Sequence, residues 1–279
     1  MNKKFLFIGT SFLGAIKQGY ESIPHGSSSA TFIGISAPDL AAHLASGWKI
    51  ADGHLHLSSD FACFISGLEI SNSDKGIDKK TFPGAERIRG LTLDIRNYDV
   101  IVFVDMFYRL RPVFSVNEAK FPYLNEAPVS SDLISELRIN GHGGWISLDK
   151  NPQYGQVPFV NSIGLMSAIQ DASEKASVYL IAAPRPPRGN VVIQAKYGDV
   201  ATARRSFDYL ENFYATQLGR QGIGYLPQPM EVLDDDGCLT RSEFSRGEHP
   251  TKVGVADEHM NQKYGEILIS RYAEKIMLI

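Results

Sequence analysis

The chain has 279 residues, of which 43% are hydrophobic and 21% are charged, and its formal net charge is −3. This length and apolar content permit a single α/β domain spanning residues 1–279, and a slightly negative chain without a basic stripe argues against nucleic acid as a partner. No apolar stretch is long enough to span a membrane, and two cysteines are too few for a disulfide framework, so we expect a cytoplasmic protein.

The first predicted element is a buried strand formed by the apolar run at residues 5–8, which stops at Gly9. A short helix is predicted over residues 11–19, so Ser11 is expected at a strand-to-helix turn. Such a turn exposes the serine hydroxyl, and the positive end of the helix favours negative charge that develops beside it. A helix N-cap is the structural alternative for Ser11.

The rest of the chain alternates between predicted strands and helices. Residues 30–40 are expected to form a strand that ends in a turn, with a helix continuing through Leu44. Further strands are expected at residues 99–104, 177–183 and 223–226, and further helices at 201–218 and 266–277. This alternation predicts a three-layer α/β/α sandwich with a mainly parallel five-stranded sheet, whose active site lies outside the carboxyl ends of the strands. The residues that follow predicted strand ends are Ser11, Ser36, Asp105 and Arg185.

Two stretches do not fit the alternation. Residues of about 45–90 are rich in Ser, Asp, Lys and Gly but contain alternating apolar pieces that predict extra strands in a β-hairpin. Residues of about 112–154 are similarly irregular. Insertions after strand ends commonly form lids or substrate walls, so we expect these two to shape the specificity of the site.

A histidine near the opposite end of the chain is the candidate base for Ser11. A serine hydroxyl is a weak nucleophile at its own pKa, so a neighbouring base must accept its proton. His259 precedes the last predicted helix, and Asp257, two residues earlier, is placed to fix its tautomer and stabilise the imidazolium. Glu248 and His249 remain the alternative acid and base.

These two ends together resemble motifs of the SGNH hydrolases, also called GDSL esterases. Gly9-Thr10-Ser11 resembles the family's first block, Gly-Asp/Asn-Ser, with Thr10 in the middle position. His259-x-Asn261, followed by Tyr264-Gly265, looks like the late block of bacterial carbohydrate-modifying esterases. The resemblance implies a flavodoxin-like sandwich, with Ser11 as nucleophile and His259 as base.

The chain departs from the family in three blocks. In the late block, Asp-x-x-His, Ala256 stands three residues before His259, and Asp257 stands only two before it. After the second strand, Ala37 follows Ser36 where the family has glycine, although its backbone N–H is retained as an oxyanion donor. After Val104 the chain reads Asp105-Met106-Phe107-Tyr108-Arg109 and lacks the Asn of the family's Gly-x-Asn block. Loss of one oxyanion donor typically costs about 3–4 kcal/mol of transition-state stabilisation. The candidate replacements are Asn140, His142 and the amides of Gly143 and Gly144.

Several other motifs have plainer structural explanations beside a functional one. Arg185 is a candidate to bind a substrate carboxylate or phosphate, with a solvent-facing position as the alternative. The spacing of His54 and His56 suits a metal, but the sequence offers no third ligand nearby, so no metal site is predicted. The acidic run at residues 234–237 is interpreted as an Asp-Gly turn rather than a calcium loop.

The sequence therefore predicts a serine-dependent esterase that removes acyl groups from a carbohydrate or a small ester. The reaction passes through an acyl-enzyme on Ser11, uses the amides of Ser11 and Ala37 for the oxyanion, and needs no metal or cofactor. One alternative is a glycan O-acyltransferase that uses the same residues. Others are an inactive SGNH-fold protein that binds a glycan or partner, and a nucleotide-binding α/β protein. The sequence carries no signal for an oligomeric state.

Overall fold

A computed structural model describes most of the chain outside a long stretch before residue 158. The described residues are 3–24, 26–36, 40, 48–68, 75–76, 86–109, 158–189, 199–248, 254, 256–257 and 259–277. The predicted insertion at 112–154 lies outside them, as do Ala37, His249 and the candidate donors at 140–144.

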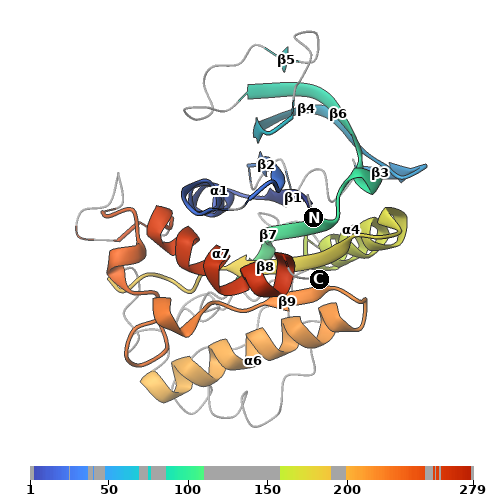
Figure 1. Ribbon diagram of the computed structural model, residues 1–279. Helices are drawn as coiled ribbons and strands as arrows, with labels where there is room; N and C mark the ends of the chain where they lie inside the picture. The colour runs from blue at the N-terminus through green and yellow to red at the C-terminus, as the bar shows by residue number, and fades with distance from the viewer. Residues whose placement is uncertain are drawn as a thin grey trace.

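A parallel sheet forms the centre of the molecule (Figure 1). Its strands lie in the order β2 (Ser29–Ile35), β1 (Lys4–Gly9), β7 (Val100–Arg109), β8 (Ser177–Ala183) and β9 (Gly224–Leu226), and each neighbouring pair is parallel. These are the five strands that the sequence predicts, so the α/β fold class is confirmed.

Helices cover both faces of this sheet. Residues of α1 (Leu13–Ser22) and α7 (Gln262–Met277) belong to one apolar cluster, and residues of α4 (Pro158–Ser173) and α6 (Val200–Gly219) belong to another. The strands between them are apolar along most of their length for this reason. In β1, Phe5 and Phe7 face the first cluster while Leu6 and Ile8 face the second.

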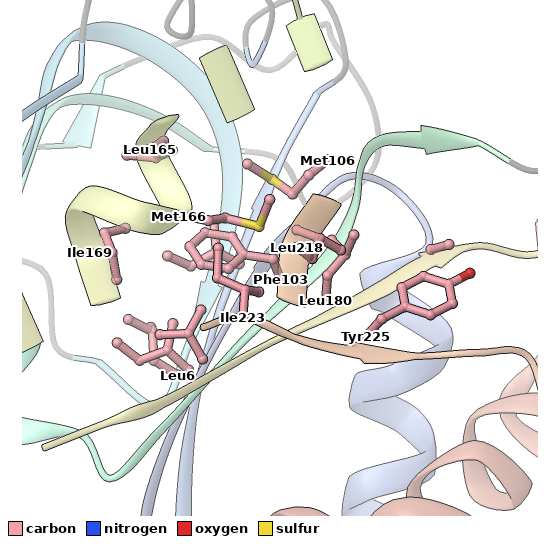
Figure 2. Packing of buried hydrophobic residues seen from close by; sticks show 14 of the residues in the cluster. Leu6, Phe103, Met106, Leu165, Met166, Ile169, Leu180, Leu218, Ile223 and Tyr225 are labelled. Atoms are coloured by element: carbon pink, nitrogen blue, oxygen red, sulfur yellow. The ribbon is translucent and has the colours of Figure 1, made fainter. Parts of the chain in front are cut away.

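The second cluster is drawn in Figure 2. The figure shows part of the cluster, in which strands β1, β7 and β8 and helices α4 and α6 supply, among others, Leu6, Phe103, Leu180, Met166, Ile169 and Leu218. All of these side chains are buried. Close packing of both sheet faces is what holds the carboxyl ends of the strands in fixed relative positions.

The helix α4 was not predicted from the sequence. Its apolar residues do not form a clear stripe, and it contains Gly164, which has a low helix propensity. Leu165, Met166 and Ile169 nevertheless bury against the sheet. Tertiary packing rather than local propensity stabilises this helix.

An antiparallel extension widens the sheet beyond the five predicted strands. It consists of β3 (Trp48–Ala51), β4 (His54–Ser66), β5 (Lys75–Gly76) and β6 (Glu86–Asp94), and β4 pairs antiparallel with β2. Asp52 and Gly53, both with positive φ, form the turn between β3 and β4, as a two-residue hairpin requires. The predicted hairpin is therefore present, but it continues the central sheet and raises it to nine strands. In Figure 1 the long strands β4 and β6 arch away from the parallel strands.

The second parallel strand ends at Ile35, so Ser36 follows the strand end as the sequence predicts. The carbonyl of Ser36 accepts a hydrogen bond from the Leu40 amide at 2.8 Å. Short 3₁₀ helices lie at Ile95–Asn97, Met230–Val232 and Ser242–Phe244. In the part of the chain that the structure describes, no helix is both long and apolar enough to cross a membrane.

Candidate active site

Ser11 lies directly after β1, at the carboxyl edge of the parallel sheet. Its side chain is exposed, and helix α1 begins two residues later. The residue at the N-cap position of α1 is Phe12, and no side chain caps the helix, so Ser11 does not serve as an N-cap. The backbone amides of Leu13 and Gly14 donate to the carbonyls of Thr10 and Ser11, at 3.0 and 3.3 Å. The hydroxyl of Ser11 is therefore free of a structural role in the helix.

The structure brings Ser11, His259 and Asp257 into one hydrogen-bonded chain. The Oγ atom of Ser11 lies 3.0 Å from Nε2 of His259, although the two residues are 248 positions apart. The Nδ1 atom of the same ring lies 2.8 Å from Oδ1 of Asp257, which also accepts the backbone N–H of His259 at 3.1 Å. With the proton on Nδ1, the imidazole presents an unprotonated Nε2 to the serine hydroxyl.

Asp257 is held in its ionised form. Burial by itself raises the pKa of this carboxyl, but the hydrogen bonds from His259 and the charges of His259 and Arg246 outweigh it and leave the pKa below its usual value. Asp257 is therefore an anion that can stabilise a positive charge on the His259 ring.

Hydrogen bonds to the backbone fix the loop that carries Asp257 and His259. The amide of Arg246 donates to the carbonyl of His259 at 3.0 Å, and the amide of Asp257 donates to the carbonyl of Gly247 at 2.7 Å. The hydroxyl of Ser245 donates to the carbonyl of Asp257 at 2.6 Å. Two residues of the loop are thus held by the 245–247 segment before helix α7 begins.

Asn261 and Phe12 complete the setting of His259. The side-chain oxygen of Asn261 accepts the amide of Tyr264 at 3.2 Å and so caps α7, while its NH₂ group donates to the carbonyls of Glu243 and Ser245. The ring of Phe12 lies against the imidazole with 5.7 Å between centroids. The Asn of the predicted late block thus positions the helix that follows the base.

A buried hydrogen bond is formed by Thr10, the residue before Ser11. The hydroxyl of Thr10 donates to Oδ2 of Asp105 at 2.6 Å, and the two side chains are 2% and 0% exposed. Asp105 and Met106 both adopt positive φ, at 67° and 43°, in an irregular part of β7. Positive φ is costly for residues other than glycine, and such strain tends to cluster at functional sites.

This arrangement corrects the predicted role of Asp105. We expected it to contact the oxyanion or the substrate, but its side chain has no solvent exposure and its carboxylate accepts from Thr10. The sequence reasoning missed Thr10 as its partner. The available signal was its position in the middle of the first block, where the family has an acid or an amide and this chain has a hydroxyl.

Arg185 is also displaced from its predicted place at the substrate rim. Its side chain is 3% exposed, and its guanidinium donates to Asp208 at 3.3 Å, to Glu211 at 2.9 Å and to the carbonyl of Gly237 at 2.5 Å. It also lies over the ring of Phe207, 4.8 Å from the centroid. Arg185 is therefore part of the packing between β8 and α6, and neither a substrate contact nor a solvent-facing side chain.

The predicted oxyanion donors are partly described. Among the described residues the Ser11 amide is not paired with a backbone carbonyl, although those of Thr10 and Leu13 are. Ser36 follows β2, which pairs with β1 so that Gly34 lies opposite Gly9, and this places it at the same sheet edge as Ser11. Ala37 lies outside the described residues.

Of the alternative acid and base, Glu248 is exposed and forms a backbone bridge with Ala256.

The remaining motifs have structural explanations. In the ranges that the structure covers, no group of three or more potential ligands is arranged for a metal. His54 and His56 lie on β4 with ring centroids 6.2 Å apart, and Nδ1 of His56 is 3.1 Å from Oγ1 of Thr92. The acidic run forms the expected turn, in which the Gly237 amide donates to the carbonyl of Asp234 at 2.8 Å.

Comparison with known proteins identifies no family from the sequence. No protein-family model matches the chain, and no curated protein matches it. Among solved structures, the chain is similar to the periplasmic domain of a lipopolysaccharide acetyltransferase from Salmonella ser. Paratyphi A. The TM-score is 0.40 and the identity 13%, over 99% of this chain and 84% of that chain. A similarity of this size carries no argument about function.

Proposed function

We propose that this protein is a serine-dependent ester hydrolase in which Ser11, His259 and Asp257 act together. The observation that carries the proposal is the continuous chain of hydrogen bonds from Ser11 Oγ through both ring nitrogens of His259 to the Asp257 carboxylate. Each group is one that nucleophilic acyl transfer needs, at the distance that proton transfer needs. We propose acyl esters of a carbohydrate or a small alcohol as the substrate class.

In the first half of the reaction, Ser11 Oγ attacks the acyl carbon while its proton passes to Nε2 of His259. The imidazolium formed is stabilised by the ionised Asp257. Collapse of the tetrahedral intermediate breaks the bond to the alcohol, which leaves with the proton from Nε2. Water then repeats the sequence on the acyl-enzyme and releases the carboxylic acid and free Ser11.

The oxyanion of the intermediate needs preorganised donors at the carboxyl edge of the sheet. The Ser11 amide at the start of α1 is available among the described residues, and the positive end of that helix lies beside it. We propose the Ala37 amide, after β2, as the second donor. No metal or organic cofactor takes part in the proposed steps.

The exposure of the site favours hydrolysis over acyl transfer. Ser11 is exposed and the side chain of His259 is 33% exposed, so water reaches the position from which an acyl-enzyme is attacked. An acyltransferase has to exclude water from that second step. The same geometry accepts an alcohol in place of water, which is why the test includes one.

The test is labelling with a fluorophosphonate probe, followed by intact mass, on the wild-type protein and on Ser11→Ala and His259→Ala. We expect one adduct on the wild type, none on Ser11→Ala, and a rate on His259→Ala lower by at least about 10³-fold, because the hydroxyl loses its base. Ser270→Ala is the matched control, since Ser270 is an exposed serine on α7. Hydrolysis of aryl acetates and of acetylated sugars is then measured with and without a free sugar as competing acceptor.

A folded wild-type protein that takes up no probe would contradict the proposal and favour the inactive, ligand-binding alternative. Label that persists on Ser11→Ala would place the nucleophile elsewhere. Acyl transfer to the added sugar in preference to water would make the protein an acyltransferase that uses the same residues.

A further inference from the structure

The helices that follow the nucleophile and the base cross in direct backbone contact. Helix α1 begins two residues after Ser11, and helix α7 begins three residues after His259. The two helices lie side by side on the same face of the sheet (Figure 1). Their crossing is formed by Gly19 of α1 and Gly265 of α7.

Neither glycine leaves room for a side chain. A Cβ on Gly265 would overlap the carbonyl oxygen of Ala15, would lie 2.7 Å from the carbonyl carbon of Ala15, and would lie 3.2 Å from the Gly19 amide. A Cβ on Gly19 would overlap the backbone of Gly265 and Glu266 and would lie 2.6 Å from the Gly265 carbonyl oxygen. All of these neighbours are backbone atoms, so the helices themselves have to move to make space.

We infer that this glycine crossing is a positioning device that sets the distance between Ser11 and His259. The inference rests on the proposed function, because it assigns Gly19 and Gly265 a role through that pair. Ala15 of α1 lies four residues after Ser11, and it touches Gly265, which lies six residues after His259. The hydrogen bond of 3.0 Å between Ser11 and His259 therefore joins the two segments that precede the crossing helices.

Hydrogen bonds hold the first turns of α1 and α7 to the segments before them. A displacement of the helices where they cross therefore also displaces Ser11 from His259. The amide of Leu13 is bonded to Thr10, and Asn261 caps the first turn of α7. A methyl group on Gly265 needs a shift of roughly 1 Å, since real Cβ atoms stay at least 3.0 Å from such neighbours. A shift of that size breaks the hydrogen bond between Ser11 and His259, and a misplacement of about 1 Å can cost on the order of 100-fold in rate.

A second contact lies near the start of both helices, but it is made by the flexible side chain of Arg246. The Nε atom of Arg246 donates to the carbonyl of Met260 at 3.3 Å, and its Nη2 atom would lie 3.2 Å from a Cβ on Gly14. The end of an exposed arginine moves easily, so a methyl group at Gly14 displaces no backbone. Gly14 is therefore a matched comparison for Gly265.

The experiment compares Gly265→Ala and Gly19→Ala with Gly14→Ala and Gly164→Ala. Gly164 lies on α4, where a Cβ would have open space around it. The rate of labelling by the fluorophosphonate is measured per folded protein, with the folded fraction taken from circular dichroism and urea titration. We expect Gly265→Ala and Gly19→Ala to lose about 30- to 100-fold, and Gly14→Ala and Gly164→Ala to stay within about threefold of the wild type.

A double-mutant cycle separates positioning from a general loss of structure. If Gly265→Ala acts by moving His259 away from Ser11, it costs nothing further once His259 is Ala, so the two losses are not additive. Additive losses would overturn the inference. A folded Gly265→Ala protein that labels at the wild-type rate would also overturn it. In that case, labelling of the wild type and absence of label on Ser11→Ala would still support the proposed function.

Failure of both crossing variants to fold would overturn the inference as well, because the crossing would then be a requirement of the fold rather than of the distance between Ser11 and His259. Failure of the wild-type protein to label belongs to the proposed function alone.

Discussion

At the scale of residues, the hydroxyl of Thr10, the residue before Ser11, distinguishes this candidate site. Thr10 gives its hydrogen bond to the buried Asp105, so the residue before Ser11 is tied to the end of β7. The amide of Thr10 also donates to the carbonyl of Val104 at 3.3 Å. The turn that presents Ser11 is thus fixed to the neighbouring strand by one backbone and one side-chain bond.

Thr10→Val tests the side-chain bond. Valine keeps the shape and removes the donor, so the hydrogen bond to the Asp105 carboxylate is lost, at a cost of about 1.5–3 kcal/mol in unfolding free energy. We expect the labelling rate per folded protein to fall about tenfold, because Ser11 loses part of its positioning. Urea unfolding and the labelling assay measure the two effects.

Thr10→Ser is the control for this substitution, since it restores the hydroxyl and should recover both the stability and the rate. A Thr10→Val protein with the stability and rate of the wild type would show that the bond to Asp105 does not support the site.

At the scale of elements, Arg185 connects the end of β8 to helix α6 and to the segment that follows β9. Its backbone amide donates to the side-chain oxygen of Gln228 at 2.8 Å, and its carbonyl accepts the hydroxyl of Thr240 at 2.6 Å. Burial raises the pKa of Glu211, although the charge of Arg185 acts in the opposite direction. The guanidinium is therefore the cation that allows a carboxylate to be buried here.

Arg185→Met tests this assignment. Methionine fills much of the space but leaves Glu211 without its cation, so we expect a loss of about 3–5 kcal/mol in unfolding free energy. The labelling rate of the protein that remains folded should stay close to that of the wild type. A rate that falls sharply in a fully folded variant, or a KM that rises alone, would return Arg185 to the role of substrate contact.

At the scale of the whole molecule, a residue from near the start of the chain and one from near its end meet at one edge of the sheet. Ser11 follows the strand β1 at the centre of the sheet, and His259 is brought to it by packing of α7 against α1 on the same face. The site therefore exists only in the folded chain, and the interactions of Asp257 within it contribute to the free energy of unfolding.

The pH dependence of stability follows from Asp257. Its pKa is lower in the folded protein than in the unfolded chain, so its contribution is present above the unfolded pKa and is lost as the pH falls through the folded pKa. The difference in unfolding free energy between the wild type and Asp257→Asn should be largest near neutral pH and should shrink below about pH 4. Urea unfolding from about pH 7 to pH 3 measures it, and a difference that stays constant or grows on acidification would contradict the lowered pKa.

Much of the parallel sheet could be predicted because its strands are buried on both faces and are therefore short apolar runs. The run at 177–183 coincides with β8, and the run at 223–226 differs from β9 by one residue. Helix α4 could not be predicted, since its stability comes from packing. The antiparallel extension was only half predicted, because pairing of β4 with β2 depends on residues far apart in the chain. The single-domain organisation and the cytoplasmic location remain predictions.

The sequence by itself determined the fold class and the residue types of the candidate site. Ser11, Asp257 and His259 were named from their types and local context, because strand ends and nucleophile motifs are local signals. Only the tertiary structure decided their 3.0 and 2.8 Å separations, the burial of Asp105 under Thr10 and the removal of Arg185 from the rim. Distances and burial depend on how distant segments pack, and no local pattern in the chain encodes that packing.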